Sequence, residues 1–125
     1  MILNEFDEVI VSQRKEPGTL FHDCWAFPGG YQEYGESWAQ TSYREVLEEC
    51  ALELDEQQIK VLEIMDIQFL EANYHNVGVF TFIQVKKDKT HFSTTEPHKN
   101  SYWRWVAWKD FIKKKPLFIP FKYFF

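Results

Sequence analysis

Residues 30–52 read GYQEYGESWAQTSYREVLEECAL, and this stretch determines what the rest of the chain folds around. Ser37 is followed three residues later by Gln40, which makes a capping box, a signal that starts a helix. After Ser37, apolar side chains recur at helical spacing and predict one buried face; they are Ala39, Tyr43, Val46, Leu47 and Cys50. The stretch therefore predicts a helix that packs this face against a sheet.

Short apolar and β-branched segments on both sides of this helix are typical of strands. The expected strands are residues 9–11, 25–27, 61–70, 75–86 and 102–106, with a short helix over 108–114. The segment 75–86 is apolar on both faces, so we expect a well-buried strand there. Strands before and after one long helix predict a single α+β domain over residues 1–125, a sandwich with a mixed sheet.

The composition is that of a globular, acidic protein. The 125 residues carry a formal net charge of −5, and 45% of them are hydrophobic. The sequence has no basic stripe to bind nucleic acid and no apolar run of the roughly 18 residues that span a membrane. Cys24 and Cys50 lack metal-binding or redox spacing, which predicts two buried thiols in a cytoplasmic protein.

Three carboxylates stand close together on the predicted helix. Glu45, Glu48 and Glu49 fall within an arc of about 100°, which we expect to lie opposite the apolar face. Carboxylates crowded in this way repel one another unless a positive charge lies between them, and a hard divalent cation prefers oxygen ligands. Taken alone, the three residues fit a solvated helix face better than a metal site.

The register of the surrounding residues changes that interpretation. Gly30 is followed after five residues by Glu36, and Glu36 after seven residues by Arg44-Glu45-Val46-Leu47-Glu48-Glu49, with Leu52 beyond. This pattern closely resembles the Nudix box, G-x5-E-x7-R-E-U-x-E-E-x-G-U, in which U is aliphatic. One specified position departs from it, because Ala51 stands where the box has glycine. Alanine there costs little if the residue remains helical.

The resemblance implies a role for each matching residue. Glu45, Glu49 and the Gly29 carbonyl would bind Mg2+ or Mn2+, and Glu48 would hold a second metal ion or accept a proton from water. Arg44 and Glu36 would fix the carboxylates through charge-assisted hydrogen bonds. Gly30 would let the backbone approach the metal and the phosphates closely. The fold implied is a Nudix-type α/β/α sandwich.

Segments outside the box resemble the Nudix enzymes that cleave purine nucleoside triphosphates and oxidised dGTP. They are Trp25–Ala26–Phe27 with Pro28, Asn73–Tyr74–His75, Glu96–Pro97, Trp103–Arg104–Trp105 and Pro116–Leu117–Phe118. The resemblance implies that Glu96 acts in catalysis and that His75 and Phe118 line the substrate site. Three departures concern the substrate: only Ile2-Leu3 represents the usual first strand, Ile119 replaces an aromatic residue, and Tyr31 replaces His or Lys near the phosphates.

The sequence therefore predicts an Mg2+-dependent hydrolase that converts a purine nucleoside triphosphate into the monophosphate and pyrophosphate. The expected partners are a small-molecule nucleotide and a second copy of the chain, with neither nucleic acid nor membrane. Two alternatives stay open. One is a diphosphatase for a dinucleotide, a sugar nucleotide or an isoprenoid diphosphate, and the other is an inactive nucleotide-binding relative.

Overall fold

The computed structural model describes residues 1–118. Its strands are β1 (Ile2–Asn4), β2 (Glu8–Gln13), β3 (Trp25–Ala26), β4 (Lys60–Phe69), β5 (Tyr74–Val85) and β6 (Arg104–Ala107). Its helices are α1 (Trp38–Cys50) and α2 (Trp108–Phe111), with single 3-10 turns η1 (Glu56–Gln58), η2 (Leu70–Ala72) and η3 (Lys87–Lys89). Within this part of the chain, no helix is both long and apolar enough to cross a membrane.

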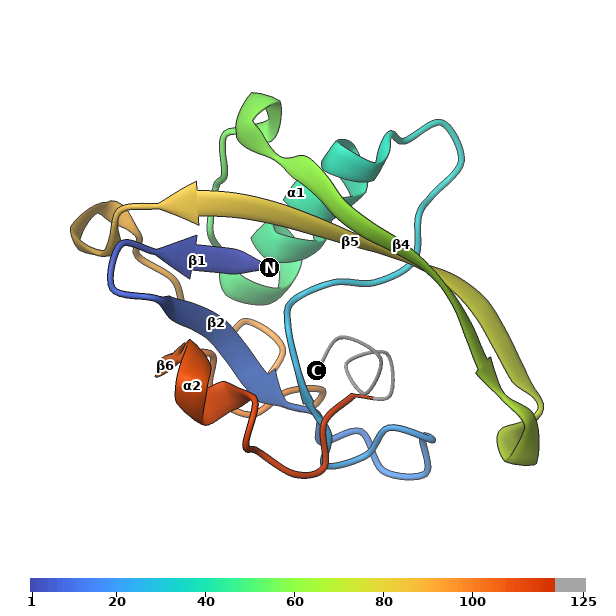
Figure 1. Cartoon of the computed structure of the whole chain (residues 1–125). Coiled ribbons are helices and arrows are strands. Elements are labelled where there is room, and N and C mark those ends of the chain that lie inside the picture. Colours follow the sequence, from blue (N-terminus) through green and yellow to red (C-terminus); the bar gives the residue numbers. More distant parts are fainter. Residues whose placement is uncertain (119–125) are drawn as a thin grey trace.

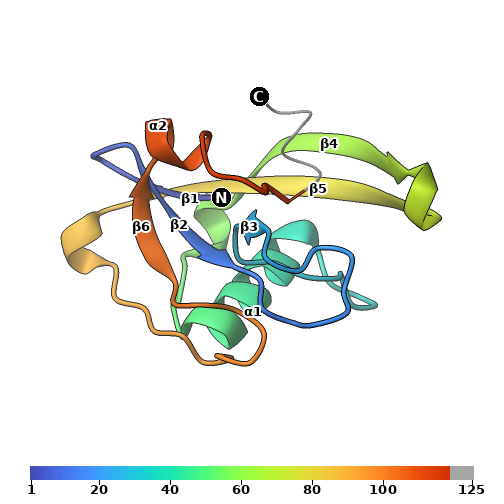
Figure 2. The same cartoon turned by 90° about the horizontal axis from the view of Figure 1, so that it is seen from below.

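The strands form a mixed sheet in the order β3-β2-β1-β5-β4, and β6 also pairs with β2. The pairing of β1 with β5 is parallel, whereas the other pairings are antiparallel. Figures 1 and 2 show α1 on one face of this sheet and α2 on the other. The predicted α/β/α sandwich with a mixed sheet is confirmed.

Strand β2 divides the core between the two faces because successive side chains point to opposite sides of a sheet. Ile10 packs with Val46 and Cys50 on the α1 face. Val9 and Val11 pack with Phe111 on the α2 face. Cys24 and Cys50 are free, buried thiols, as predicted.

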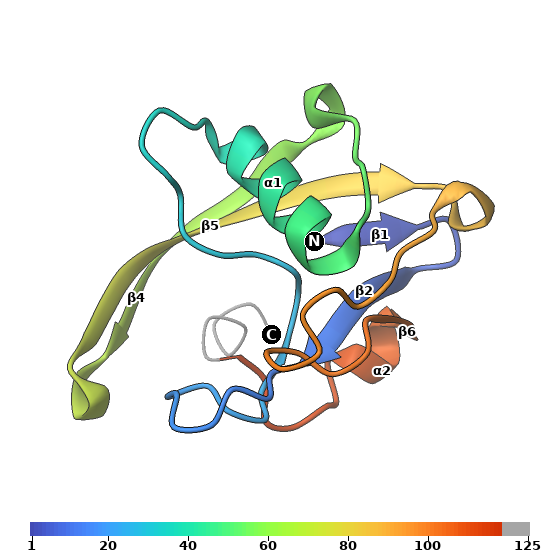
Figure 3. The same cartoon turned by 180° about the vertical axis from the view of Figure 1, so that it is seen from behind.

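The prediction of a well-buried strand at residues 75–86 was wrong for most of its length. β5 runs from Tyr74 to Val85, and β1 pairs only with Ile83, Gln84 and Val85. The rest of β5 pairs with β4 alone, so the two strands extend past the sheet as a ribbon (Figure 3). One face of this ribbon meets solvent, and Val77 is 66% exposed.

Two boundaries near the end of the described chain also differ from the prediction. β6 begins at Arg104 rather than at residue 102, because its ladder with β2 runs only from Arg104, opposite Val11, to Ala107, opposite Glu8. α2 ends at Phe111 rather than at residue 114, and the chain then turns toward the Lys115–Pro116 bond. Proline cannot continue a helix, which accounts for the early stop.

Helix α1 begins as the capping box predicts, but its buried face is rotated from the expected one. Ser37 accepts a hydrogen bond from the Gln40 backbone N–H, and the Gln40 side chain accepts one from Ser37 N–H. Thr41, Val46 and Cys50 are buried, whereas Leu47 is 38% exposed. The expectation that Leu47 belongs to the buried face was therefore wrong.

The helix ends at Ala51, which is not helical as expected but adopts the left-handed conformation with φ 50° and ψ 34°. Its backbone N–H still bonds to the Leu47 carbonyl. A side chain with a Cβ is disfavoured in this region by about 1–2 kcal/mol, whereas glycine adopts it readily. The box glycine that alanine replaces thus has a conformational function at this position.

We therefore expect Ala51→Gly to stabilise the fold by about 0.5–1 kcal/mol, because relief of the strain exceeds the greater entropy of glycine in the unfolded chain. The melting temperature should rise by about 2–5 °C in differential scanning calorimetry. The matched control is Ala39→Gly inside α1, which should destabilise by about 1 kcal/mol. A fall in stability for Ala51→Gly would contradict the assigned conformation.

Candidate active site

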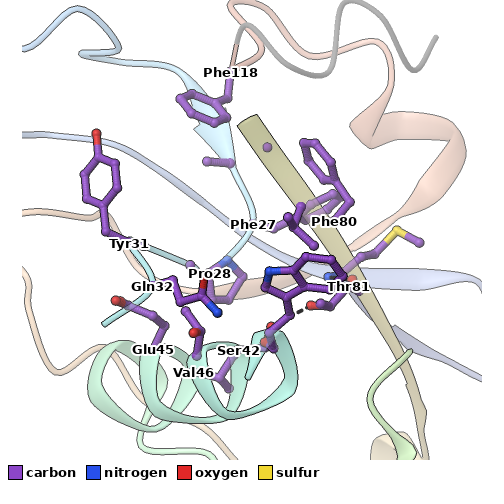
Figure 4. Close-up of a pocket in the computed structure, with 18 of the residues that line it drawn as sticks. Phe27, Pro28, Tyr31, Gln32, Ser42, Glu45, Val46, Phe80, Thr81 and Phe118 are labelled. Atoms are coloured by element: carbon purple, nitrogen blue, oxygen red, sulfur yellow. Dashed lines mark hydrogen bonds between the residues drawn. The ribbon is translucent and has the colours of Figure 1, made fainter. Parts of the chain in front are cut away.

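A cavity of about 370 Å³ lies between α1, the loop that precedes it and strand β5. Figure 4 shows Glu45, Ser42 and Val46 on its helix side, and Phe118 at the opposite end. Phe27, Phe80 and Thr81 complete the wall in that view. One end of the cavity therefore carries carboxylate chemistry, and the other offers aromatic surface.

The centre of the helix side is a bidentate ion pair between Arg44 and Glu36. Arg44 Nε donates to Glu36 Oε1 at 2.6 Å, and Nη2 donates to Oε2 at 3.1 Å. Glu36 also accepts hydrogen bonds from the Glu33 N–H and the Thr41 hydroxyl. These contacts, the Arg44 hydrogen bonds above all, hold the pKa of Glu36 at about 2 and raise the pKa of Arg44. The pair is therefore ionised at any physiological pH.

Arg44 also fixes two other groups of the motif. Its Nη1 donates to Glu45 Oε1 at 2.8 Å and to Glu48 Oε2 at 3.3 Å. Its Nη2 donates to the Tyr31 carbonyl at 2.9 Å, which anchors the loop before the helix. One guanidinium group thus joins the loop, Glu36 and two of the three clustered carboxylates. This arrangement agrees with the supporting role that we predict for Arg44 and Glu36.

The carboxylates do not lie opposite the buried face, as we expected from the sequence. The Glu45 side chain is only 15% exposed and Glu49 is partly buried, whereas the Glu48 side chain is 54% exposed. The helix is rotated so that Glu45 and Glu49 flank the buried Val46 and Cys50. Two carboxylates therefore point into the molecule beside the loop, and one stays at the solvent edge.

Glu49 has an unusual environment for a carboxylate. Its Oε2 accepts a hydrogen bond from the Gly29 N–H at 2.9 Å, and its Oε1 accepts one from the Asn100 amide at 3.2 Å. Burial raises the pKa of Glu49 to about 7, and the charges of Glu45 and Glu96 add to the rise. The two hydrogen bonds offset only part of this effect. The site thus carries negative charge that its own residues do not balance.

Gly30 leaves the space in which the Glu45 carboxylate lies. A Cβ built on Gly30 would lie 2.7 Å from Glu45 Oε2 and 2.5 Å from Glu45 Cδ. No real pair of atoms of these kinds approaches so closely, so any other residue would displace Glu45. Gly29 meets the site through its N–H, whereas the resemblance predicts its carbonyl as a metal ligand.

The chemistry of these donors fits a divalent cation. Glu45, Glu48 and Glu49 supply hard oxygen ligands, and the raised pKa of Glu49 marks charge that a cation would neutralise. Their geometry is more open than a closed metal cluster, because each carboxylate bonds to Arg44, Gly29 or Asn100. Across residues 1–118, no three side chains of His, Cys, Asp or Glu form a metal-binding group as they stand.

The loop before β6 brings two further groups to Glu49. Glu96 lies near enough for its charge to raise the pKa of Glu49, although it pairs with Lys99 at 2.8 Å. Asn100 is buried and holds Glu49 directly, and sequence analysis missed it. Its only signal was its place four residues after Glu96. The contact joins residues 51 positions apart, which no local pattern reveals.

The aromatic end of the cavity contains Phe118, as predicted. Phe21 packs edge-on against both Phe118 and Tyr74, with ring centroids 4.6 Å and 5.3 Å apart. Arg14, another residue that sequence analysis missed, lies 5.9 Å from the Phe118 ring centre. Its Nε is buried without a hydrogen-bond partner in the described part of the chain. This end therefore combines stacking surface with a donor that lacks an acceptor.

The remaining predicted site residues divide into three cases. Tyr31 lines the cavity mouth and is 76% exposed. His75 does not line the cavity; it lies on the exposed ribbon, where its Nε2 is 2.6 Å from Asp66 Oδ1. The neighbours of His75 along the strand, Tyr74 and Asn76, do line the cavity, as the alternation of a strand explains. Ile119 lies outside the described residues.

Comparison with known proteins adds a family relationship. A family model described as NUDIX domain matches residues 1–124. The chain is 28% identical over 91 residues to an m7GpppN-mRNA hydrolase, NUDT17, of Xenopus laevis. That match covers 67% of this chain and 30% of the relative, so the chain spans about a third of the relative's length.

Solved structures share the fold at low sequence identity. A MutT NUDIX hydrolase from Burkholderia pseudomallei superimposes with a TM-score of 0.78 at 18% identity, covering 98% of this chain and 91% of that chain. The NUDIX domain of NrtR from Shewanella oneidensis, solved with ADP ribose, gives 0.78 at 20% identity, covering 98% and 78%. At these identities the likeness shows the fold alone.

Proposed function

The chain belongs to the NUDIX family of diphosphate hydrolases, and from this premise we propose that it cleaves a nucleoside triphosphate, with a purine base favoured. The products would be the nucleoside monophosphate and pyrophosphate. The observation that carries the proposal is the cavity that joins the α1 carboxylates to an aromatic end. A nucleotide has the same division, a charged phosphate chain and a flat base.

In this proposal Glu45 and Glu49 hold Mg2+ or Mn2+, with the Gly29 carbonyl and Glu48 as further oxygen ligands. The bound cation would polarise the diphosphate and lower the pKa of a water molecule. Arg44 and Glu36 keep Glu45 in place, and Asn100 does the same for Glu49. Glu48, at the solvent edge, would accept the proton of the attacking water. Glu96 would act beside Glu49.

The aromatic end supports a base as the other part of the substrate. Phe21, Tyr74 and Phe118 supply ring faces and edges, and such contacts contribute about 0.5–1.5 kcal/mol each beyond area burial. The buried Nε of Arg14 would gain an acceptor from a nucleotide. Purines offer more stacking area than pyrimidines, which favours them here.

The relatives support a second candidate, a substrate with a nucleotide on one side of the diphosphate and another group on the other. The Xenopus relative is named for capped mRNA, and the NrtR domain was solved with ADP ribose. Dinucleotides, sugar nucleotides and isoprenoid diphosphates are therefore the alternatives, and an inactive nucleotide-binding relative is the third. A homodimer and a cytoplasmic location stay predictions.

An activity screen tests these proposals directly. We expect pyrophosphate and monophosphate to be released from purine nucleoside triphosphates in Mg2+ and no release after chelation with EDTA. The products are measured by liquid chromatography across nucleoside triphosphates, dinucleoside polyphosphates, ADP ribose and isoprenoid diphosphates. Faster cleavage of another class would replace the proposed substrate, and binding without cleavage of any would favour the inactive relative.

A further inference from the structure

Two hydroxyl groups meet across the cavity wall next to the carboxylates. Ser42 lies on α1 and Thr81 on β5, and both line the cavity. Their oxygen atoms are 2.7 Å apart, a contact that Figure 4 marks with a dashed line. The side chains around them are apolar, among them Val46 and Phe80. A polar pair in such surroundings contributes to which ligand groups the cavity accepts.

The direction of the hydrogen bond follows from the second contact of Ser42. Ser42 Oγ lies 2.9 Å from the Trp38 carbonyl oxygen, which can only accept. A serine hydroxyl has a single hydrogen. Both contacts are hydrogen bonds at once only when Ser42 donates to Trp38 and Thr81 donates to Ser42. The Thr81 hydroxyl has then used its hydrogen, and Thr81 Oγ1 offers the cavity lone pairs alone.

The pair stands one helical turn from the carboxylate site. Ser42 precedes Glu45 by three residues on the same side of α1, a spacing that places Cβ atoms about 5–6 Å apart. A substrate whose diphosphate lies at Glu45 therefore brings its next chemical group to Thr81. A group with an N–H or O–H gains a hydrogen bond there, and a group with only acceptor atoms does not.

Building on the proposed function, we propose that Thr81 is a specificity-determining residue that accepts a hydrogen bond from the substrate. The ligand chemistry required is a donor on the part of the nucleotide adjoining the phosphates. Two sources share that chemistry, a hydroxyl of the sugar and an N–H of the base. Analogues that lack one donor at a time distinguish them.

The experiment compares kcat/KM of the wild type and Thr81→Val on GTP, 2′-deoxy-GTP, 3′-deoxy-GTP, ITP and purine riboside triphosphate. Valine keeps the shape and removes the acceptor. We expect a loss of about tenfold, mostly in KM, on substrates that bear the donor, and no loss on the analogue that lacks it. A deoxy analogue that escapes the loss identifies the sugar hydroxyl. ITP or purine riboside triphosphate identifies the base.

Two further variants complete the test. Thr81→Ser keeps the acceptor and should restore the wild-type preference. Ser42→Ala leaves Thr81 free to donate, so it should weaken the preference for donor-bearing substrates even if Thr81→Val folds poorly. Thr19→Val removes a hydroxyl in the turn after Glu16, outside the cavity, and should change nothing.

The outcomes separate this inference from the proposed function. An equal loss on all five nucleotides for Thr81→Val, with an unchanged preference for Ser42→Ala, overturns the role of Thr81 while the hydrolase activity stands. Failure of the wild type to cleave any of the five overturns the proposed function and this inference with it. Melting temperatures of all variants show whether a loss of activity reflects unfolding.

Discussion

Glu49→Gln should lower kcat/KM by about 100- to 1,000-fold, because it removes one of the two partly buried carboxylates proposed to hold the cation. Glutamine matches glutamate in size and can still accept the hydrogen bond from the Gly29 N–H, so the fold should persist. The activity is measured across a Mg2+ titration, and Mn2+ binding is measured by calorimetry. The matched control is Glu53→Gln, which changes a nearby acidic residue outside the cavity lining. Wild-type Mn2+ affinity in Glu49→Gln would contradict the assignment.

The same substitution has a predicted effect on stability in the absence of divalent cations. The pKa of Glu49 is raised from 4.5 to about 7 in the folded protein, so between these values the folded state binds more protons than the unfolded state. The free energy of unfolding should therefore fall as pH rises from about 4.5 to 7, by on the order of 1–3 kcal/mol. Urea unfolding in EDTA at pH 5 and pH 7.5 should show this fall in the wild type and a smaller fall in Glu49→Gln.

Local signals predicted what depends on neighbours in the chain. The capping box of Ser37 and Gln40 placed the start of α1, and alternating apolar residues placed β4 and β5 to within one residue. The spacing of the box placed Arg44 against Glu36, eight residues away, where the ion pair forms. Each of these depends on the period of a helix or strand, which the sequence displays directly.

Features that depend on packing between distant segments were not predictable in this way. The rotation of α1 that exposes Leu47 and turns Glu45 and Glu49 inward is set by the sheet and by the Gly29–Gly30 loop. Polar residues can line a buried face when a loop supplies their partners, so hydrophobic periodicity alone misplaces that face. Asn100 and Thr81 reach the site from segments that follow α1 by dozens of residues.

Gly30→Ala should separate the geometry of the site from the stability of the fold. The backbone of Gly30 is not in the left-handed region, so alanine adds no conformational strain there. Its Cβ would collide with the Glu45 carboxylate, and Glu45 would have to move away from Glu49 and from Arg44 Nη1. A displacement of about 1 Å at a reacting centre costs on the order of 100-fold, which is the loss of kcat/KM that we expect.

The control for this variant is Gly18→Ala, because it should show the reverse pattern. Gly18 has a φ of 76° with no atom near its missing Cβ, so alanine strains the backbone in a turn far from the carboxylates. Gly18→Ala should lose about 1 kcal/mol of stability and keep its activity. Gly30→Ala should keep its melting temperature and lose both activity and Mn2+ affinity. If Gly30→Ala bound Mn2+ as tightly as the wild type, the close approach of Gly30 to Glu45 would have no role in holding the cation.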